Sequence, residues 1–271
     1  MSTTTHVLVI YNPVSGARKW RDVPGEIRAA LSEKGCTWTW FETQARARQD
    51  FSTLRGRSFD RIIVVGGDGT VSEVVDFLLH EKITAPLYVL PQGSANVLGW
   101  SLGVPLVLDL KHAVKKALTA APKTVDAFLV NRKSYGLIAV GRGYDAFLMQ
   151  ETDRPFKRRW GPLAYLWMAL KTVLFYRSQP YKITVDKNRL FVSAKLVMVV
   201  NLLPVPRFLV KNNDGLLNVF IVTNRHRIQM WTGKNIVVKA PGEMSFQLDG
   251  EIHHAKTLQV EVVPGAVRVV S

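Results

Sequence analysis

Cysteine is almost absent from this chain of 271 residues, which carries a single thiol at Cys36. One thiol excludes an intramolecular disulfide, so a reducing compartment is the simpler interpretation. The first residues also lack a basic start followed by an apolar run, and we therefore expect no signal peptide. These two absences favour a cytoplasmic protein.

Long hydrophobic runs are missing as well. The most apolar long stretch, residues 160–176, includes a glycine, a proline and a lysine, and it is shorter than the ~20 residues that span a bilayer. None of the six histidines has the spacing of a metal site, and the neighbours His253 and His254 are expected to face opposite sides of a strand. We therefore predict neither a transmembrane helix nor a histidine metal centre.

Acidic residues are too few to balance the basic ones, and the formal net charge is +15. Residues 1–122 hold 14 Lys and Arg against 11 Asp and Glu, whereas residues 123–271 hold 22 against 10. A basic surface favours anionic lipid headgroups, phosphorylated substrates or nucleic acid, and a solvated surface without a partner is the alternative. Charge is the only feature of the sequence that suggests nucleic acid, so we do not expect a nucleic-acid partner.

The first part of the chain, residues 1–122, alternates strands and helices. Apolar positions at offsets 0, 3, 4, 7 and 8 predict an amphipathic helix from Val71 to Leu79. Pro24 and Gly35 mark the start and end of an earlier helix. Strands separated by helices predict a parallel α/β domain with helices on both faces. The expected strands cover residues 6–11, 36–41, 61–65 and 87–90, and a last helix covers residues 110–118.

Beyond Pro122 the pattern changes to strands joined by short polar turns. This order predicts a second, mainly antiparallel β domain over residues 123–271, and it leaves open whether the last strand returns to the first domain. The expected strands cover residues 181–186, 190–201, 216–223, 236–239 and 257–263, and one long helix covers residues 161–176.

A glycine-rich turn, Gly66 to Thr70 (GGDGT), follows a predicted buried strand and opens a helix. Glycines let backbone N–H groups approach an anion closely, and a helix N-terminus favours negative charge. Thr70 is predicted to cap this helix, with Glu73 as its capping-box partner. Asp68 would repel a phosphate unless a cation bridges them, which predicts Mg²⁺ at Asp68. The alternative is that Asp68 caps local backbone.

Two further predicted strands end in small, hydrogen-bonding residues, at 12–16 (NPVSG) and at 91–96 (PQGSAN). In open parallel sheets, ligands bind beyond the carboxyl ends of the strands. Three such turns at one edge predict a nucleotide pocket.

In this order and at these intervals, the three turns resemble the catalytic domain of the diacylglycerol kinase family, which includes bacterial lipid kinases and sphingosine kinases. The resemblance continues in residues 141–146 (GRGYDA), 213–217 (NDGLL) and 249–251 (DGE), so it covers nearly the whole chain. It implies ATP and Mg²⁺ bound in a cleft between the two domains, and this cleft would be the active site.

The resemblance also implies a role for each matched residue. Asp249 would be the general base that takes the proton of the acceptor hydroxyl, Glu251 would help to order the metal or its water, and Asp68 would bind the metal. Without the family, Asp249 and Gly250 read as a hairpin turn. The residues assigned to the nucleotide are Asn12, Thr43, Gly66, Gly67, Asp68, Gly69, Thr70, Glu73, Gly93, Ser94 and Asn96.

Two positions depart from the family pattern. Val97 stands where many members carry Asp, so one carboxylate of the metal network is missing. The segment 201–212 lacks the glycine pair expected after Asn201, which alters the loop on the acceptor side.

Residues near the expected acceptor favour a lipid. The basic and aromatic segment 154–160 suits a membrane interface, and the apolar residues of 202–209 form either an acceptor wall or a loop that touches lipid. We therefore predict a cytoplasmic, ATP-dependent kinase of a diacylglycerol-like or sphingoid-like lipid that associates peripherally with anionic membranes. A kinase of a soluble hydroxyl compound such as NAD, a catalytically weak nucleotide-responsive membrane-binding protein, and a homodimeric assembly are the alternatives left open.

Overall fold

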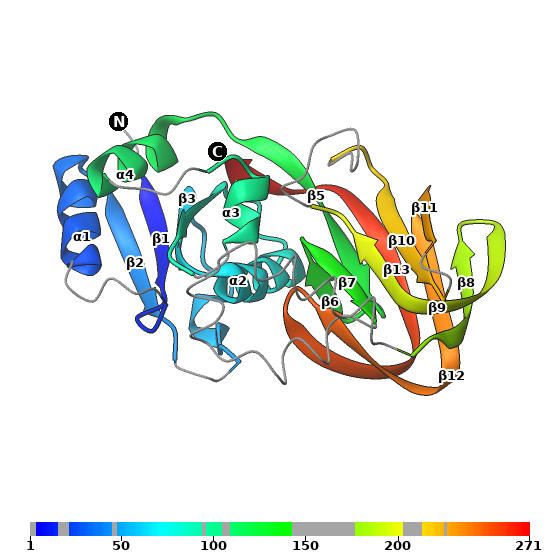
Figure 1. The fold of residues 1–271 in the computed structure, drawn as a ribbon. Helices are drawn as coiled ribbons and strands as arrows, with labels where there is room; N and C mark the ends of the chain where they lie inside the picture. Colours follow the sequence, from blue (N-terminus) through cyan, green and yellow to red (C-terminus); the bar gives the residue numbers. More distant parts are fainter. Residues whose placement is uncertain are drawn as a thin grey trace. The chain divides into compact units, whose positions relative to one another are not determined.

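The computed structural model describes residues 4–15, 22–44, 48–93, 96–104, 109–142, 177–202, 213–224 and 227–271. Several predicted features lie outside the described residues: Ser94, the segment 154–160, the helix over 161–176, and most of the GRGYDA motif and of the loop 202–209. The chain divides into two compact units (Figure 1). The first unit is Met1–Val125 with Ala266–Ser271, and the second unit is Asp126–Gly265.

The first unit contains a parallel sheet with the strand order β4-β3-β1-β2. Its strands are β1 (His6–Tyr11), β2 (Thr37–Glu42), β3 (Arg61–Gly66) and β4 (Leu87–Pro91). Its helices are α1 (Val23–Glu33), α2 (Asp68–His80), α3 (Val97–Ser101) and α4 (Leu110–Thr119), with a short 3₁₀ helix, η1 (Ser52–Leu54). The last residues of β13 (Glu251–Val270) pair in parallel with β4, Val269 opposite Leu87 and Val270 opposite Tyr88.

Both faces of β1, β3 and β4 are buried, which explains why these three strands are mostly apolar, whereas the edge strand β2 is partly exposed. Successive residues of a strand point to opposite faces. Val7, Val9 and Ile63 pack with residues of α1 and α4 on one face (Figure 1). Leu8, Ile10, Ile62 and Val64 alternate with them, point to the other face and are also fully buried.

The ends of α1 follow the residues that predicted them. The Asp22 carboxylate accepts a hydrogen bond from the Gly25 amide at 2.9 Å, and Pro24 lies in the first turn. Gly35 has φ +65°, the left-handed conformation that glycine adopts without a steric penalty after a helix. The predicted start and end of this helix are therefore confirmed.

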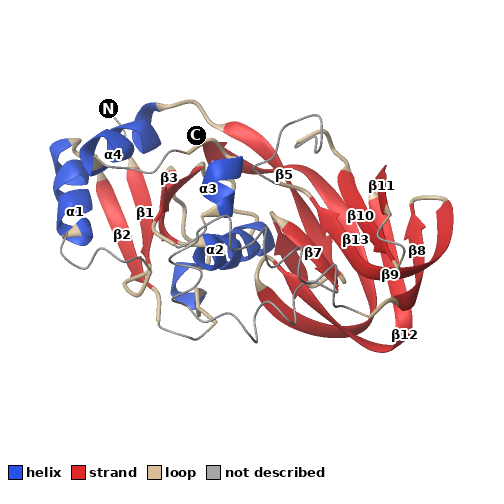
Figure 2. Cartoon of the chain, in the orientation of Figure 1, coloured by secondary structure: helices blue, strands red, loops and turns tan. Residues whose placement is uncertain are grey.

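The described residues of the second unit form strands, most of them antiparallel neighbours (Figure 2). Strand β9 pairs with β10 on one side and with β7 and β8 on the other, and β12 pairs with β7, β8 and β13. Strand β5 pairs with β13 and forms a hairpin with β6. The strands are β5 (Lys123–Val130), β6 (Ser134–Gly136), β7 (Ala139–Arg142), β8 (Gln179–Val185), β9 (Asn188–Val200), β10 (Leu217–Thr223), β11 (Ile228–Gly233) and β12 (Asn235–Leu248).

A hydrophobic core of described residues holds the strands of the second unit together. It gathers residues of β5, β7 to β10, β12 and β13, among them Val140, Tyr181, Val197 and Phe246. In the part of the chain that the structure describes, no helix has the length and apolar character to cross a bilayer.

Candidate functional site

Four strand ends meet at the carboxyl edge of the parallel sheet in the first unit. Asn12 follows β1, Thr43 follows β2, Gly67 follows β3 and Gln92 follows β4. The backbone pairing continues past the strands, because the Asn12 amide donates to the Val65 carbonyl and the Thr43 amide to the Tyr11 carbonyl, both at 2.9 Å. Residues far apart in the sequence are thus brought to one edge.

The two glycine turns at this edge touch each other through their backbones. A Cβ atom on Gly93 would lie 2.7 Å from the Gly67 Cα, and a Cβ on Gly67 would lie 3.1 Å from the Gly93 Cα. A side chain is therefore excluded at Gly93, and one at Gly67 would require the facing backbone to shift by a few tenths of an ångström. Gly69 differs, because a Cβ there would meet no heavy atom within 4 Å.

Asn12 connects the turn after β1 to α2. Its Nδ2 donates to the Thr70 hydroxyl at 2.7 Å, and its Oδ1 accepts from the Val14 amide at 3.0 Å. The predicted capping box of α2 is wrong: the helix begins at Asp68, and its N-cap is Gly67, which makes no side-chain capping bond. Thr70 is already inside the helix, where its hydroxyl serves as the partner of Asn12.

Asn96 closes the turn after β4. Its Oδ1 accepts from the Gly93 amide at 2.8 Å and its Nδ2 donates to the Gly93 carbonyl at 2.7 Å. The residue has φ 48°, a left-handed conformation that asparagine tolerates better than most side chains. The two hydrogen bonds between Asn96 and Gly93 thus link these residues directly before α3.

The Asp68 carboxylate is partly buried and binds the start of α3. One oxygen accepts from the Val97 amide at 3.0 Å and the other from the Leu98 amide at 2.9 Å. Burial raises the pKa of the Asp68 carboxyl above its ordinary value, and the amide donors oppose that shift. Asp68 therefore joins the turn after β3 to the helix after β4.

The Asp68 carboxylate, which was predicted to bind Mg²⁺, is engaged by the backbone. Both carboxylate oxygens already accept backbone amides. Among the described residues, no group of three His, Cys, Asp or Glu side chains is gathered in a way that could hold a metal ion. Val97, where many members of the resembled family carry Asp, contributes only its amide here. The alternative that Asp68 caps local backbone agrees with the geometry, and its role as a metal ligand stays a prediction.

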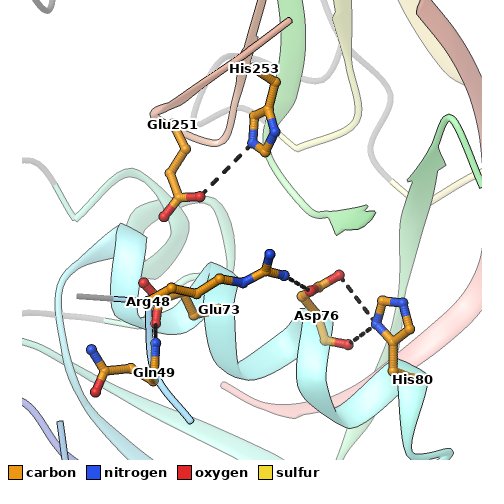
Figure 3. Close-up of polar contacts among 7 residues, drawn as sticks. All are labelled: Arg48, Gln49, Glu73, Asp76, His80, Glu251 and His253. Carbon is orange, nitrogen blue, oxygen red and sulfur yellow. Dashed lines mark hydrogen bonds and ion pairs between the residues drawn. The ribbon is translucent and has the colours of Figure 1, made fainter. Parts of the chain in front are cut away.

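Glu73 lies on the exposed side of α2 among other polar pairs (Figure 3). Its Oε2 accepts from the Gln49 amide at 3.3 Å. One turn further, Asp76 forms ion pairs with Arg48 at 3.2 Å and with His80 at 3.3 Å (Figure 3). These contacts hold the segment around Arg48 against α2, so the predicted nucleotide residue Glu73 has a structural partner.

Two hydroxyl groups near the same edge are buried without a visible partner. The Thr43 Oγ1 and the Ser15 Oγ make no hydrogen bond within the described residues, and Thr43 is only 4% exposed. Buried hydroxyl groups normally have a partner, so a ligand or a water is expected to complete them. At the end of β1, burial raises the pKa of the Tyr11 phenol, and Glu42 and Asp22 raise it further.

In the second unit, Asp249 sits in the tight turn between β12 and β13, with φ 46°. Its carboxylate accepts three backbone amides, from Leu137 at 2.7 Å and from Ile138 and Ala139 at 2.9 Å. The side chain is buried and fixes the start of β7 beside the turn. Asp249, the predicted general base, therefore also has a structural role.

Glu251 begins β13 and is more accessible. Its side chain is 57% exposed, and its Oε2 lies 3.9 Å from the His253 Nε2 (Figure 3). Residues 251 and 253 point to the same face of the strand. The His253 ring stacks on Phe246, with 5.7 Å between ring centroids.

Two buried polar residues of the second unit were not predicted as part of any site. The Asn201 Nδ2 donates to the carbonyls of Asp126 and Leu137, each at 2.8 Å. The Asp126 carboxylate accepts from the amides of Gly215 and Gly265 at 2.7 and 2.8 Å. Asn201 thus supports the same 137–139 segment that Asp249 holds. The sequence carries no local signal for these contacts, because the partners are distant along the chain.

Two family models match successive parts of the chain. Residues 6–130 match the model described as "Diacylglycerol kinase catalytic domain". Residues 138–232 match the one described as "YegS C-terminal NAD kinase beta sandwich-like domain".

Relatives and solved structures are similar over the full length. A Staphylococcus aureus (strain Mu3) protein named "Putative lipid kinase" is 22% identical over 98% of this chain and 97% of its own. A Bacillus anthracis str. Sterne crystal structure, described as that of "a putative diacylglycerol kinase", has a TM-score of 0.83 at 26% identity, and covers 100% of this chain and 96% of that one. Another structure from that organism, described as a diacylglycerol kinase, has a TM-score of 0.79 at 25% identity, with 100% and 98% covered.

Proposed function

Because the chain belongs to the diacylglycerol kinase catalytic-domain family, we propose that it transfers the γ-phosphoryl group of ATP to the hydroxyl of a lipid. As a member of this family it is a phosphotransferase with an alcohol acceptor. The acceptor of this proposal is a diacylglycerol-like or sphingoid-like lipid.

The observation that carries the proposal is the contact between the two glycine turns. A Cβ on Gly93 would overlap the Gly67 backbone, and a Cβ on Gly67 would crowd the Gly93 backbone. Gly67 is also the N-cap of α2, a 13-residue helix whose first N–H groups lie at the same edge of the sheet. Free backbone amides at a helix N-terminus bind phosphate well, so this edge suits the phosphates of a nucleotide.

The nucleotide residues of the proposal follow from this edge. Gly67 and Gly69 would let the phosphates approach the backbone, and the unsatisfied hydroxyl of Thr43 would gain a partner from the nucleotide. Asn12, Thr70 and Asn96 would act by shaping the turns, since their side chains are used in hydrogen bonds between and within them.

The proposed acid–base group is Asp249, with Glu251 beside it. Asp249 is held by three amides, which would keep its carboxylate fixed while it accepts the proton of the acceptor hydroxyl. Phosphoryl transfer depends mainly on positioning and on neutralising charge. Mg²⁺ would enter this proposal with the phosphates of ATP, and Asp68 is the side chain predicted to bind it.

Transfer of labelled γ-phosphate from Mg-ATP to a lipid panel tests the proposal, with wild type, Gly69→Ala and Asp249→Asn compared. A Cβ on Gly69 meets nothing in the protein, so this variant should keep its melting temperature while a close-lying phosphate is displaced and ATP affinity falls. Asp249→Asn should bind ATP normally and lose transfer. Labelling of no lipid by the wild type, or full activity of both variants, would contradict the proposal.

A kinase of a soluble hydroxyl compound is the second candidate. The match of residues 138–232 to an NAD kinase-like β-sandwich favours it specifically. Adding NAD to the acceptor panel separates the two: labelled NAD without labelled lipid would replace the lipid proposal by this one. ATP binding with no acceptor labelled would favour a nucleotide-responsive protein.

A further inference from the structure

A small surface cavity lies between helices α1 and α4 of the first unit, which pack against each other (Figure 1). Its volume is about 230 Å³, which is less than the roughly 300–1,000 Å³ of sites that bury drug-sized ligands. The cavity therefore suits a compact ligand and is too small for a whole nucleotide. Six of the residues that line it carry charged or titratable side chains: Glu33, Lys34, Asp109, Lys111, His112 and Lys115.

This cavity is separate from the proposed nucleotide edge. Glu33 is the last residue of α1 and Lys34 is its C-cap, so both directly precede β2. Strand β2 begins at Thr37, which pairs with His6, the first residue of β1. The cavity is thus beside the amino ends of these strands, whereas the glycine turns follow the carboxyl ends of β3 and β4.

Both carboxylates of the cavity already have partners. The Glu33 Oε1 accepts a hydrogen bond from the Lys111 Nζ at 2.8 Å, and the Asp109 Oδ1 accepts from the His112 amide at 3.1 Å, which caps α4. The hydrogen bond from Lys111 lowers the pKa of the Glu33 carboxyl and raises the pKa of the Lys111 ammonium, so both groups stay charged. Their side chains are 56% and 63% exposed. An exposed ion pair is weak, so Lys111 remains able to bind a ligand.

The cations of the cavity are not balanced by its acids. Within the described residues, no ion pair involves Lys34, His112 or Lys115. Lys111 and Lys115 are four residues apart on α4, a spacing at which like charges repel each other and destabilise a helix. The first turn of α4 holds no acidic residue, although the positive end of the helix dipole favours one there. A bound anion would relieve both of these unfavourable interactions.

We propose that this cavity binds a phosphomonoester dianion, held by Lys34, Lys111 and Lys115. This inference goes beyond the proposed kinase function and does not depend on it. A phosphomonoester presents nearly two negative charges and three acceptor oxygens at neutral pH, which suits three ammonium groups around a compact cavity, whereas a phosphodiester carries a single charge. A soluble phosphate ester and the headgroup of a lipid phosphate both offer this chemistry.

Calorimetric titration without ATP, at fixed ionic strength, tests the inference. Glycerol 3-phosphate and short-chain phosphatidic acid are the two sources of the dianion, and short-chain phosphatidylglycerol is the phosphodiester control. Each is titrated into the wild type and into Lys34→Gln, Lys115→Gln and Glu33→Gln.

Two further variants control for net charge. Lys116→Gln removes a lysine at the next position of the same helix, which does not line the cavity. Glu81→Gln matches Glu33→Gln, because it removes the acid of another ion pair of the first unit, with Arg55 at 3.1 Å. Melting temperatures show that the variants are folded.

We expect the wild type to bind a phosphomonoester, and Lys34→Gln and Lys115→Gln to weaken that binding about fivefold each, the Coulomb contribution of one unit charge at about 4 Å in water. Glu33→Gln should strengthen it, because Lys111 then has only the ligand as its partner, and the two control variants should change it little. Binding of phosphatidic acid alone, with the same dependence on the two lysines, would identify a lipid headgroup as the ligand. Binding of glycerol 3-phosphate as well would identify the phosphate group itself.

Four results would overturn the inference. These are a wild type that binds no phosphomonoester, binding that is unchanged in both lysine variants, an equal loss in Lys116→Gln, and phosphatidylglycerol bound as tightly as the phosphomonoesters. Weaker binding by Glu33→Gln, or an equal gain in Glu81→Gln, would also contradict the role given to Lys111. None of these results bears on the proposed kinase function, because no transfer of phosphate is measured.

Discussion

Asp68 and Asp249 are both aspartates whose hydrogen bonds go to the backbone amides of a neighbouring segment. Asp68 binds the amides of Val97 and Leu98, and Asp249 binds those of residues 137–139. Loss of activity after either is replaced by alanine therefore has two explanations, lost chemistry and lost local structure. Stability measurements separate them.

For Asp68→Ala we expect the free energy of unfolding to fall by about 1–3 kcal/mol, because two amides at the start of α3 lose their acceptor. Urea denaturation checks this. Asp50→Ala is the control, since its carboxylate accepts an exposed amide, that of Ser52, on the surface of the same unit. A loss no greater than that of the control would show that Asp68 does not stabilise α3.

Asp249 allows a graded test of the same kind. Asp249→Ala should be clearly less stable than Asp249→Asn, because the asparagine oxygen still accepts part of the amide bonds that hold residues 137–139. Thermal unfolding of the two variants measures the difference. If both variants were as stable as the wild type, the three hydrogen bonds to the amides would not contribute to stability. The role of Asp249 would then be limited to catalysis.

At the scale of elements, the contact of the two glycine turns makes a sharp prediction. Gly93→Ala should lower the melting temperature and weaken ATP binding, because its Cβ would lie 2.7 Å from a backbone atom of Gly67 and backbone cannot move aside as a flexible side chain can. Gly69→Ala, with open space around its Cβ, should keep its melting temperature. A Gly93→Ala protein as stable as the wild type would show that the turns are not in contact.

The regular elements could be predicted because hydrophobic periodicity is a local signal. Strands β1, β3 and β4 and the helix α2 agree with the apolar patterns at residues 6–11, 61–65, 87–90 and 71–79. Strand β12 was predicted too short, at residues 236–239, because Pro241 and Gly242 normally end a strand. In the structure the strand continues past them through a shift of register between Lys239 and Met244.

The side-chain contacts of the site could not be predicted in the same way. The sequence places Asp68 in a glycine turn but gives no indication that its partners are amides 29 and 30 residues later. The contacts of Asp249 span 110 to 112 residues and depend on the pairing of β7 with β12. The prediction of an active site in a cleft between the domains stays a prediction.

At the scale of the whole molecule, the uneven distribution of charge predicts how the protein binds a membrane. Residues 123–271 carry 22 Lys and Arg against 10 Asp and Glu, while residues 1–122 are nearly balanced at 14 against 11. Lys182 and Lys239 lie opposite each other on β8 and β12, both exposed, and the Lys182 Nζ is 5.5 Å from the ring centroid of Phe191, which is 74% exposed. Cations around an exposed aromatic ring suit an anionic bilayer surface.

We therefore predict binding to vesicles that contain anionic lipid, decreasing steeply as salt is raised, and little binding to neutral vesicles. Each Lys or Arg near an anionic surface contributes about 1 kcal/mol, and salt screens this attraction over about 8 Å at physiological ionic strength. In co-sedimentation, the double variant Lys182→Gln with Lys239→Gln should bind less than the charge-matched Lys34→Gln with Lys115→Gln, because its charges come from the more basic part of the chain. Equal losses would mean that only total charge matters. Salt-resistant binding to neutral vesicles would instead show that apolar side chains, and no electrostatic attraction, bring this protein to the lipid.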